Sequence, residues 1–115
     1  MVLRGGADGP NYQQEAVLES EQQLQKKGLN PSIMIDCSHA NSNKDHKNQS
    51  KVLDNVSKQI REGNESITGV MIESNIGPGN QSISDKLEYG VSITDACVDW
   101  DETERMLTNL AEKLH

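Results

Sequence analysis

The sequence predicts an α/β fold of about three β/α units, forming part of a (β/α)8 barrel. Two continuously apolar runs, residues 33–35 and 67–72, indicate strands that are buried on both faces. Each of these runs, and a first one at Val2-Leu3, precedes a longer stretch that contains a helical pattern. Strands that need cover on both faces and alternate with helices are typical of a parallel sheet. A closed eight-stranded barrel takes about 250 residues. The 115 residues therefore predict a single, incomplete barrel domain, 1–115.

Three stretches have the spacing of amphipathic helices. Gly28 and Gly63 are placed as helix stops, and Asp101 and Glu102 suit the positive N-terminal end of the last helix. The predicted helices cover residues 12–27, 45–62 and 101–114. The residues expected on their buried faces are Val17, Leu18 and Leu24 in the first, Val52, Leu53, Val56 and Ile60 in the second, and Met106, Leu107, Leu110 and Leu114 in the third. Residues 75–90 predict an extended loop, because glycine, proline and asparagine recur in them. The pattern of residues 93–97 assigns no element.

The composition excludes several classes of protein. A formal net charge of −7 argues against nucleic-acid binding, which requires a basic surface. No apolar run reaches the roughly 20 residues of a membrane span, and the N-terminus lacks the pattern of a secretory signal. Two cysteines make no disulfide framework. We therefore expect a cytoplasmic location. With only 33% hydrophobic residues, the chain can bury only a thin core.

Polar residues follow the apolar runs at the points where functional groups gather in β/α folds. Arg4 follows the first run, His39 follows the second together with Asp36, and Glu73 closes the third. His39 and Glu73 are good ligands for a divalent transition metal such as Mn, Fe, Co or Zn, and Asp95 is a candidate third ligand. Such an ion can polarise an aldehyde oxygen. Arg4 beside Gly5 and Gly6 offers a guanidinium group and backbone amides to a phosphate or carboxylate.

Each of these residues also has an ordinary structural interpretation. His39 can be a polar or capping residue, Glu73 and Asp95 can be solvent-facing carboxylates, and Arg4 can be a surface charge. From spacing alone, a metal-dependent β/α enzyme remains one interpretation among these. Other residues are expected to have structural roles only: Lys44, Asp45, His46 and Lys47 at a solvated helix start, Cys37 and Cys97 as small buried residues, and Met34, Met71 and Met106 in the core.

Four strings of the sequence, taken together, resemble the 3-deoxy-7-phosphoheptulonate (DAHP) synthases. They occur in the family's order and cover nearly the whole chain. The strings are Leu3-Arg4-Gly5-Gly6 with Gly9-Pro10-Asn11-Tyr12; Met34-Ile35-Asp36-Cys37-Ser38-His39-Ala40-Asn41-Ser42; Gly69-Val70-Met71-Ile72-Glu73-Ser74 with Gly79-Asn80-Gln81; and Tyr89-Gly90 with Ser92-Ile93-Thr94-Asp95-Ala96-Cys97. The resemblance is strongest to the feedback-regulated class, whose enzymes sense an aromatic amino acid.

The resemblance implies an activity and a set of roles. Enzymes of this family condense phosphoenolpyruvate with erythrose 4-phosphate in the first step of aromatic amino-acid biosynthesis. By this resemblance His39, Glu73 and Asp95 bind the divalent metal, His39 is catalytic, and Arg4 contacts phosphoenolpyruvate. His39 and Asp95 also lie next to substrate. The family's fourth metal ligand is a cysteine from an earlier part of the barrel, so neither Cys37 nor Cys97 is assigned to it.

The sequence therefore predicts the C-terminal portion of a DAHP synthase that is inactive alone. Two other interpretations stay open. One is a non-catalytic binding or regulatory module that associates with a synthase chain, and the other is a stand-alone metal-binding protein. Because an incomplete barrel has exposed sheet edges, we also expect self-association or pairing with the missing N-terminal portion.

Overall fold

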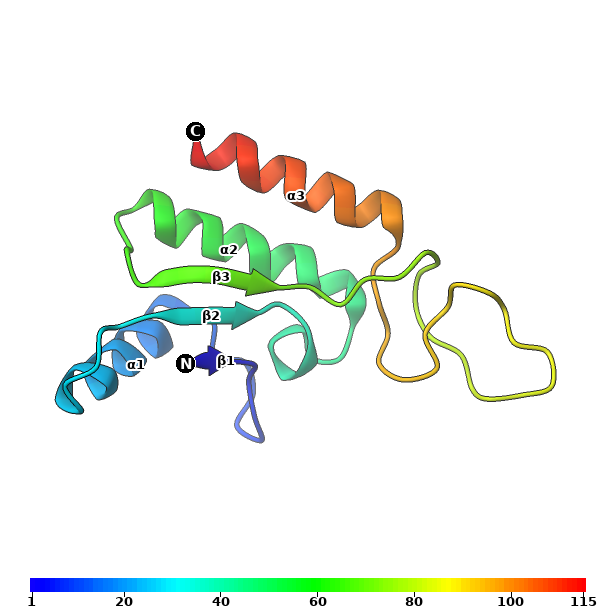
Figure 1. Ribbon diagram of the computed structural model, residues 1–115, viewed down its shortest axis with the longest axis horizontal. Coiled ribbons are helices and arrows are strands. Elements are labelled where there is room, and N and C mark those ends of the chain that lie inside the picture. The colour runs from blue at the N-terminus through cyan, green and yellow to red at the C-terminus, as the bar shows by residue number, and fades with distance from the viewer.

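The chain forms a three-stranded parallel sheet with helices between and after its strands. The computed structural model describes residues 1–115, and the strand order is β1-β2-β3 (Figure 1). The elements in chain order are β1 (Val2–Leu3), α1 (Gln14–Lys26), β2 (Ile33–Asp36), the 3-10 helices η1 (His39–Ser42) and η2 (His46–Asn48), α2 (Gln49–Arg61), β3 (Ile67–Met71) and α3 (Trp100–Leu114). The predicted alternation of strands and helices in a parallel sheet is confirmed. None of the helices is long and apolar enough to cross a membrane.

The helix ends follow the expected chemistry. Gly28 and Gly63 both have positive φ values, +72° and +110°, just after α1 and α2. At the end of α1, Gly28 N–H bonds to the Gln25 carbonyl and Leu29 N–H bonds to the Leu24 carbonyl, which closes the helix in a left-handed turn. The end of α2 repeats this pattern. The start of α3 is capped by Asp99, whose carboxylate accepts the Glu102 N–H at 2.8 Å.

The register of the sheet explains the glycine within β3. Val2 pairs with Met34 and Ile33 pairs with Ile67, but Met34 pairs with Gly69, so the ladder has an irregularity at this point. A Cβ atom at position 69 would lie 3.3 Å from the Met34 methyl group. Glycine at position 69 therefore leaves room for the side chain of Met34 across the irregular pair.

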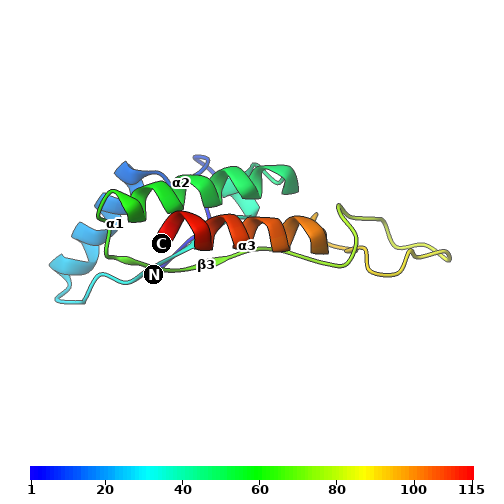
Figure 2. The ribbon, with the colours of Figure 1, turned by 90° about the horizontal axis from the view of Figure 1, so that it is seen from above.

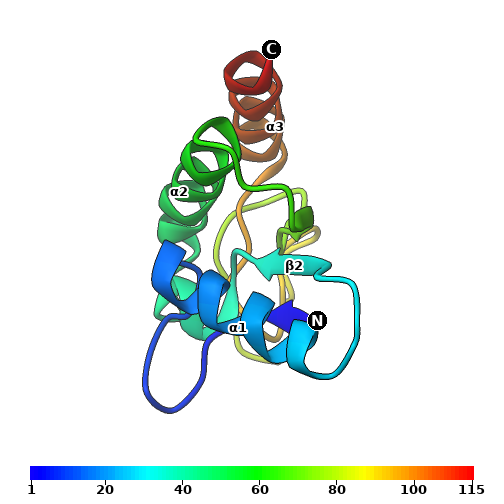
Figure 3. The same ribbon diagram turned by 90° about the vertical axis from the view of Figure 1, so that its left-hand side faces the viewer.

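The core lies on one face of the sheet, and this corrects the prediction that the strands are buried on both faces. Ile33 and Ile35 are fully buried among helix residues such as Val17, Val52 and Val56. Figure 3, which looks along the strands, shows the helices gathered on one side of the sheet. Val2 and Met34 alternate with the buried residues and are 58% and 40% exposed. This chain supplies no layer against the second face.

Several predicted core residues are exposed for the same reason. Met34 packs on no core layer, and Leu18, Leu107 and Leu114 lie on helix faces that no part of this chain covers. Met106 and Val17 are buried as predicted, and Leu24, Ile60 and Leu110 pack against the core. The helical spacing was thus correct, and all four predicted residues of α2 are buried or pack against the core, but α1 and α3 have narrower buried faces than their apolar residues indicate.

Between β3 and α3, a long segment leaves the body of the molecule and returns to it (Figures 1 and 2). It has no regular element, as predicted for residues 75–90. Its returning end joins the sheet, because a parallel bridge pairs Ser74 with Val98 and the Val98 N–H donates to the Glu73 carbonyl at 3.0 Å. The unassigned residues 93–97 thus form no strand; Cys97 is bridged to Gly79, and the next residue, Val98, is bridged beside the end of β3.

We expect the purified chain to self-associate. Strands β1 and β3 are the edges of the sheet, and one face exposes apolar side chains such as Val2 and Met34. Unpaired edges and an uncovered apolar face both favour association. Sedimentation velocity over a range of concentrations should show species larger than 12.7 kDa. A sharp monomer boundary at high concentration, with cooperative unfolding, would contradict this expectation.

Candidate metal and anion site

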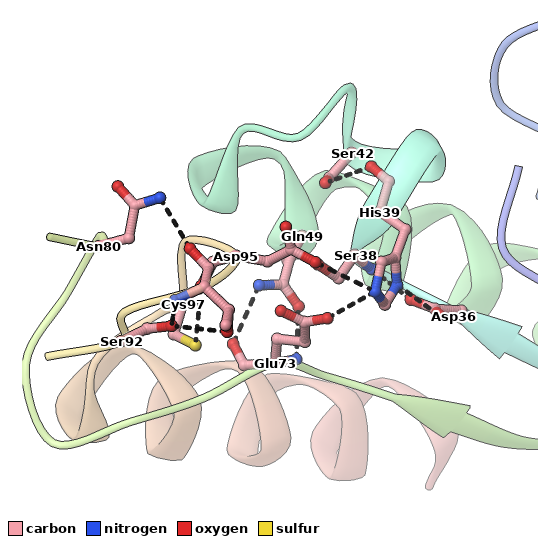
Figure 4. Close-up of polar contacts among 11 residues, drawn as sticks. Asp36, Ser38, His39, Ser42, Gln49, Glu73, Asn80, Ser92, Asp95 and Cys97 are labelled. Carbon is pink, nitrogen blue, oxygen red and sulfur yellow. Dashed lines mark hydrogen bonds and ion pairs between the residues drawn. The ribbon is translucent and has the colours of Figure 1, made fainter. Parts of the chain in front are cut away.

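Three predicted ligands come together where the strands end. The His39 Nε2 atom lies 2.8 Å from Glu73 Oε1 and 3.4 Å from Asp95 Oδ2. One ligand atom from each residue fits within a group whose members are all within 4.8 Å of one another. Figure 4 shows the His39 ring between Asp36 on one side and the carboxylates of Glu73 and Asp95 on the other. One imidazole nitrogen and two carboxylate oxygens form a donor set that suits a divalent transition metal.

His39 is held by the residues around it. Its Nδ1 atom lies 2.8 Å from Asp36 Oδ2, and Asp36 is buried at the end of β2. The backbone of His39 has φ of +50°, which is uncommon for a residue with a side chain. Strained backbone of this kind persists where the surrounding contacts determine it, and it is frequent at functional sites.

Glu73 is positioned by a residue that the sequence analysis did not single out. The Gln49 side chain, fully buried at the start of α2, donates to the Glu73 carbonyl at 3.0 Å and accepts the Glu73 N–H at 2.9 Å. The amide thus pairs with both backbone groups of Glu73, as a neighbouring strand would. It fixes the backbone beyond β3 from which the carboxylate extends.

Asp95 reaches the site from the long segment after β3. Gly79 and Cys97 exchange two backbone hydrogen bonds of 2.8 and 3.0 Å, and the Asn80 side chain donates to the Thr94 carbonyl at 2.9 Å. These bonds join the outgoing and returning arms on either side of Asp95. Its side chain is 58% exposed, so it is the most exposed of the three candidate ligands.

Asn41 holds together the backbone segments next to Arg4 through hydrogen bonds of its side chain. The Asn41 amide donates to the carbonyls of Leu3 and Asp36, at 3.0 and 2.8 Å, and its oxygen accepts the Asn11 N–H at 2.7 Å. One buried side chain therefore links the ends of β1 and β2 to the turn that follows β1. The backbone N–H of Asn41 also donates to the Arg4 carbonyl at 3.1 Å.

Arg4, His39 and Asp95 border a single cavity of about 350 Å³. Lys44, predicted to be only a solvated helix residue, lies on the same cavity wall, before the cap of η2. Its backbone has φ of +59°, in a turn that spacing rules do not anticipate. The residues lining the cavity are Arg4, Gly5, Gly6, Ser38, His39, Ala40, Lys44, Asp95 and Ala96.

The pKa values of Glu73 and of both cysteines are raised, chiefly by burial. Burial raises the pKa of the Glu73 carboxyl; His39 opposes this shift, whereas Asp95 and Asp36 reinforce it. Burial, with Asp36 nearby, raises the pKa of the Cys37 thiol to about 12, and burial also raises the pKa of Cys97. Both cysteines are buried, as the sequence predicted.

Comparison with known proteins places this geometry in a family. The model of the DAHP synthetase I family matches residues 1–108. The chain belongs to this family. It is 53% identical to the tyrosine-inhibited phospho-2-dehydro-3-deoxyheptonate aldolase of Schizosaccharomyces pombe, over 97% of this chain and 32% of the relative. It is 47% identical to the Tyr-sensitive enzyme of Escherichia coli K12, over 100% of this chain and 33% of the relative.

A solved structure of a phospho-2-dehydro-3-deoxyheptonate aldolase, from Francisella tularensis SCHU S4, superimposes with a TM-score of 0.93 at 49% identity. The match covers 98% of this chain and 33% of that protein. The chain thus spans about a third of the length of these DAHP synthase relatives. Three of the four strings line one cavity, and the string that contains Glu73 meets them through its contact with His39.

Proposed function

We propose that this chain provides the divalent-metal site and part of the phosphoenolpyruvate site of a DAHP synthase, as the C-terminal β/α units of a (β/α)8 barrel. The observation that carries the proposal is the meeting of His39, Glu73 and Asp95 beside a cavity that Arg4 also lines. Family membership supports the same assignment, because the relatives are named as phospho-2-dehydro-3-deoxyheptonate aldolases.

The donor set fits a divalent ion such as Mn, Fe, Co or Zn. His39 Nε2 and one oxygen each from Glu73 and Asp95 lie close enough to share it. Neither cysteine supplies a further ligand: Cys37 lies within the hydrophobic core, and the Cys97 thiol donates to the Asp95 carbonyl at 3.6 Å. The chain would therefore hold an ion with three ligands only, which leaves room for further ligands, as in catalytic metal sites.

The residues around the cavity match the chemistry of the reaction. A divalent ion held by His39, Glu73 and Asp95 would supply Lewis-acid chemistry toward the aldehyde oxygen of erythrose 4-phosphate. Arg4 holds an anionic group of phosphoenolpyruvate through its guanidinium group, and Lys44 adds a second positive charge to the same wall. His39 and Asp95 orient the aldehyde beside the enol carbon. That carbon, C3 of phosphoenolpyruvate, forms the new bond to the aldehyde carbon, and the aldehyde oxygen takes up a proton. Water then adds to C2, which the broken C=C bond leaves electron-poor, and phosphate departs with the C2–O bond electrons.

We expect the chain to bind one divalent ion weakly through His39. Calorimetric titration with Mn²⁺ or Zn²⁺ should show one site that disappears in His39→Ala, because imidazole nitrogen is the only neutral ligand of the three. His46→Ala is the matched control, since His46 lies in η2 outside the ligand group. Unchanged binding in His39→Ala would contradict the assignment.

A non-catalytic binding module is the second candidate, and the uncovered sheet face favours it. A chain that exposes one face of a parallel sheet has a surface that fits the remaining part of a barrel. Pairing with such a partner is required by both candidates, and only the synthase assignment requires Arg4 and His39 in the paired state. Turnover on pairing therefore separates the two.

A further inference from the structure

Asp36 is not one of the proposed metal ligands, but its buried side chain contacts one of them, His39. The Asp36 side chain is 5% exposed, and each of its two carboxylate oxygens has a separate partner. Oδ1 accepts the Ser38 N–H at 2.8 Å, and Oδ2 lies 2.8 Å from His39 Nδ1. Its carbonyl accepts a hydrogen bond of 2.8 Å from Asn41, so its backbone is fixed too.

These contacts determine which ring nitrogen of His39 carries the hydrogen. An ionised carboxylate only accepts hydrogen bonds, so His39 Nδ1 must be the donor to Oδ2. In a neutral imidazole the other nitrogen, Nε2, then has a free lone pair. That lone pair faces the carboxylates of Glu73 and Asp95, at 2.8 and 3.4 Å. Three electron-rich atoms pointing at one another require either a proton or a metal cation between them, and a neutral His39 in this tautomer leaves the place open to a cation.

We propose that Asp36 is a positioning residue that holds His39 as the Nδ1–H tautomer and so presents the Nε2 lone pair to a divalent cation shared with Glu73 and Asp95. The inference rests on the metal site proposed above and adds a residue that does not touch the ion. Carboxylates that orient a ligating histidine in this way commonly change metal affinity by about 10–100-fold when they are replaced.

The replacement Asp36→Asn reverses the polarity of this contact with little change in shape. The Ser38 N–H needs an acceptor, so the amide oxygen takes the place of Oδ1. The amide NH2 group then faces Nδ1 and donates to it, which moves the ring hydrogen to Nε2. A ring in that tautomer has no lone pair to offer at the ligand position.

Asp45 provides the matched control. Its Oδ1 accepts the Lys47 N–H at 3.0 Å, the same two-residue turn that Asp36 makes with Ser38, but it contacts no histidine. Asp45→Asn therefore removes a carboxylate from the same kind of turn, between β2 and α2, without changing the environment of His39 Nδ1. Unchanged far-ultraviolet circular dichroism should establish that both variants keep the fold.

Two measurements on the whole chain test the inference. Nitrogen-15 NMR of the ring, at a pH where it is neutral, should give the Nδ1–H form for the native chain and the Nε2–H form for Asp36→Asn. Titration with Zn²⁺ should show affinity reduced about 10–100-fold in Asp36→Asn and unchanged in Asp45→Asn.

The outcomes separate this inference from the proposed function. If His39→Ala leaves Zn²⁺ binding unchanged, the metal site itself is wrong, and the NMR result still decides the role of Asp36. If His39 is required but Asp36→Asn binds Zn²⁺ as the native chain does, the positioning role is wrong. An Nε2–H form in the native chain overturns it directly, even if the Asp36→Asn variant does not fold.

Discussion

The purified chain is expected to release no phosphate from phosphoenolpyruvate and erythrose 4-phosphate in the presence of Mn²⁺. The reaction requires both substrates and the metal to be held together in one water-restricted pocket. This chain supplies three proposed metal ligands, with Arg4 and Lys44 as the cations that line the cavity. Its cavity is bordered by a sheet that is open on one face. Misplaced or missing positioning groups each cost orders of magnitude in rate, so their combined loss should remove detectable turnover.

Activity is expected to return when the remaining two-thirds of a family member is added, provided that the two parts pair. Arg4→Ala should then impair the use of phosphoenolpyruvate in particular, because the guanidinium group binds an anion of that substrate. His39→Ala should abolish turnover. His46→Ala, outside the ligand group, serves as the control. Robust, metal-dependent turnover by the isolated chain would contradict the proposal that this chain holds only part of the active site.

Gly5→Ala is expected to destabilise the fold more than any other alanine replacement of a glycine in a positive-φ turn. Gly5 has φ of +79°, and a Cβ atom there would lie 2.8 Å from backbone atoms of Ala40 and Asn41. The left-handed backbone costs an alanine about 1–2 kcal/mol. Forcing the loop after β2 away from β1 adds about 1–3 kcal/mol, as overpacking does elsewhere. Urea unfolding should therefore show a clearly lowered midpoint.

Gly28→Ala isolates the backbone contribution to this effect. Gly28 has φ of +72°, close to that of Gly5, but no atom lies within 4 Å of the position of its Cβ. The difference between the two variants thus measures the close approach of the Gly5 backbone to the site wall. Equal midpoints for the two variants would show that this approach contributes nothing to stability.

The sequence alone predicted the order of the elements and the residues that meet in the candidate site, for identifiable reasons. Apolar runs mark strands whatever their surroundings, and Gly28 and Gly63 end helices through local backbone geometry. Polar residues just beyond parallel strands must lie at one edge of the sheet, which brings His39 and Glu73 together. Asp95 was a candidate by its chemistry, and the resemblance assigned it to the ligand set, because its segment has no local pattern.

Other features depend on contacts between distant segments and could not be predicted from spacing. Gln49 fits a polar helix start, and only the fold places its amide against the backbone of Glu73. Lys44 lines the cavity because an uncommon turn precedes η2. The exposure of Met34 was missed because an apolar residue in a strand indicates burial, whereas this chain lacks the layer that would bury it.

The topology of the sheet also governs how the chain folds. β1, β2 and β3 are all parallel, so every ladder bond joins residues separated by at least one complete helix. No strand can pair with its partner through a local hairpin, and loop closure must precede any gain from pairing. The helices can form early, but the sheet forms late, and its apolar strands stay exposed meanwhile. Refolding of this chain is therefore a competition between slow, long-range pairing within one molecule and faster encounters between molecules.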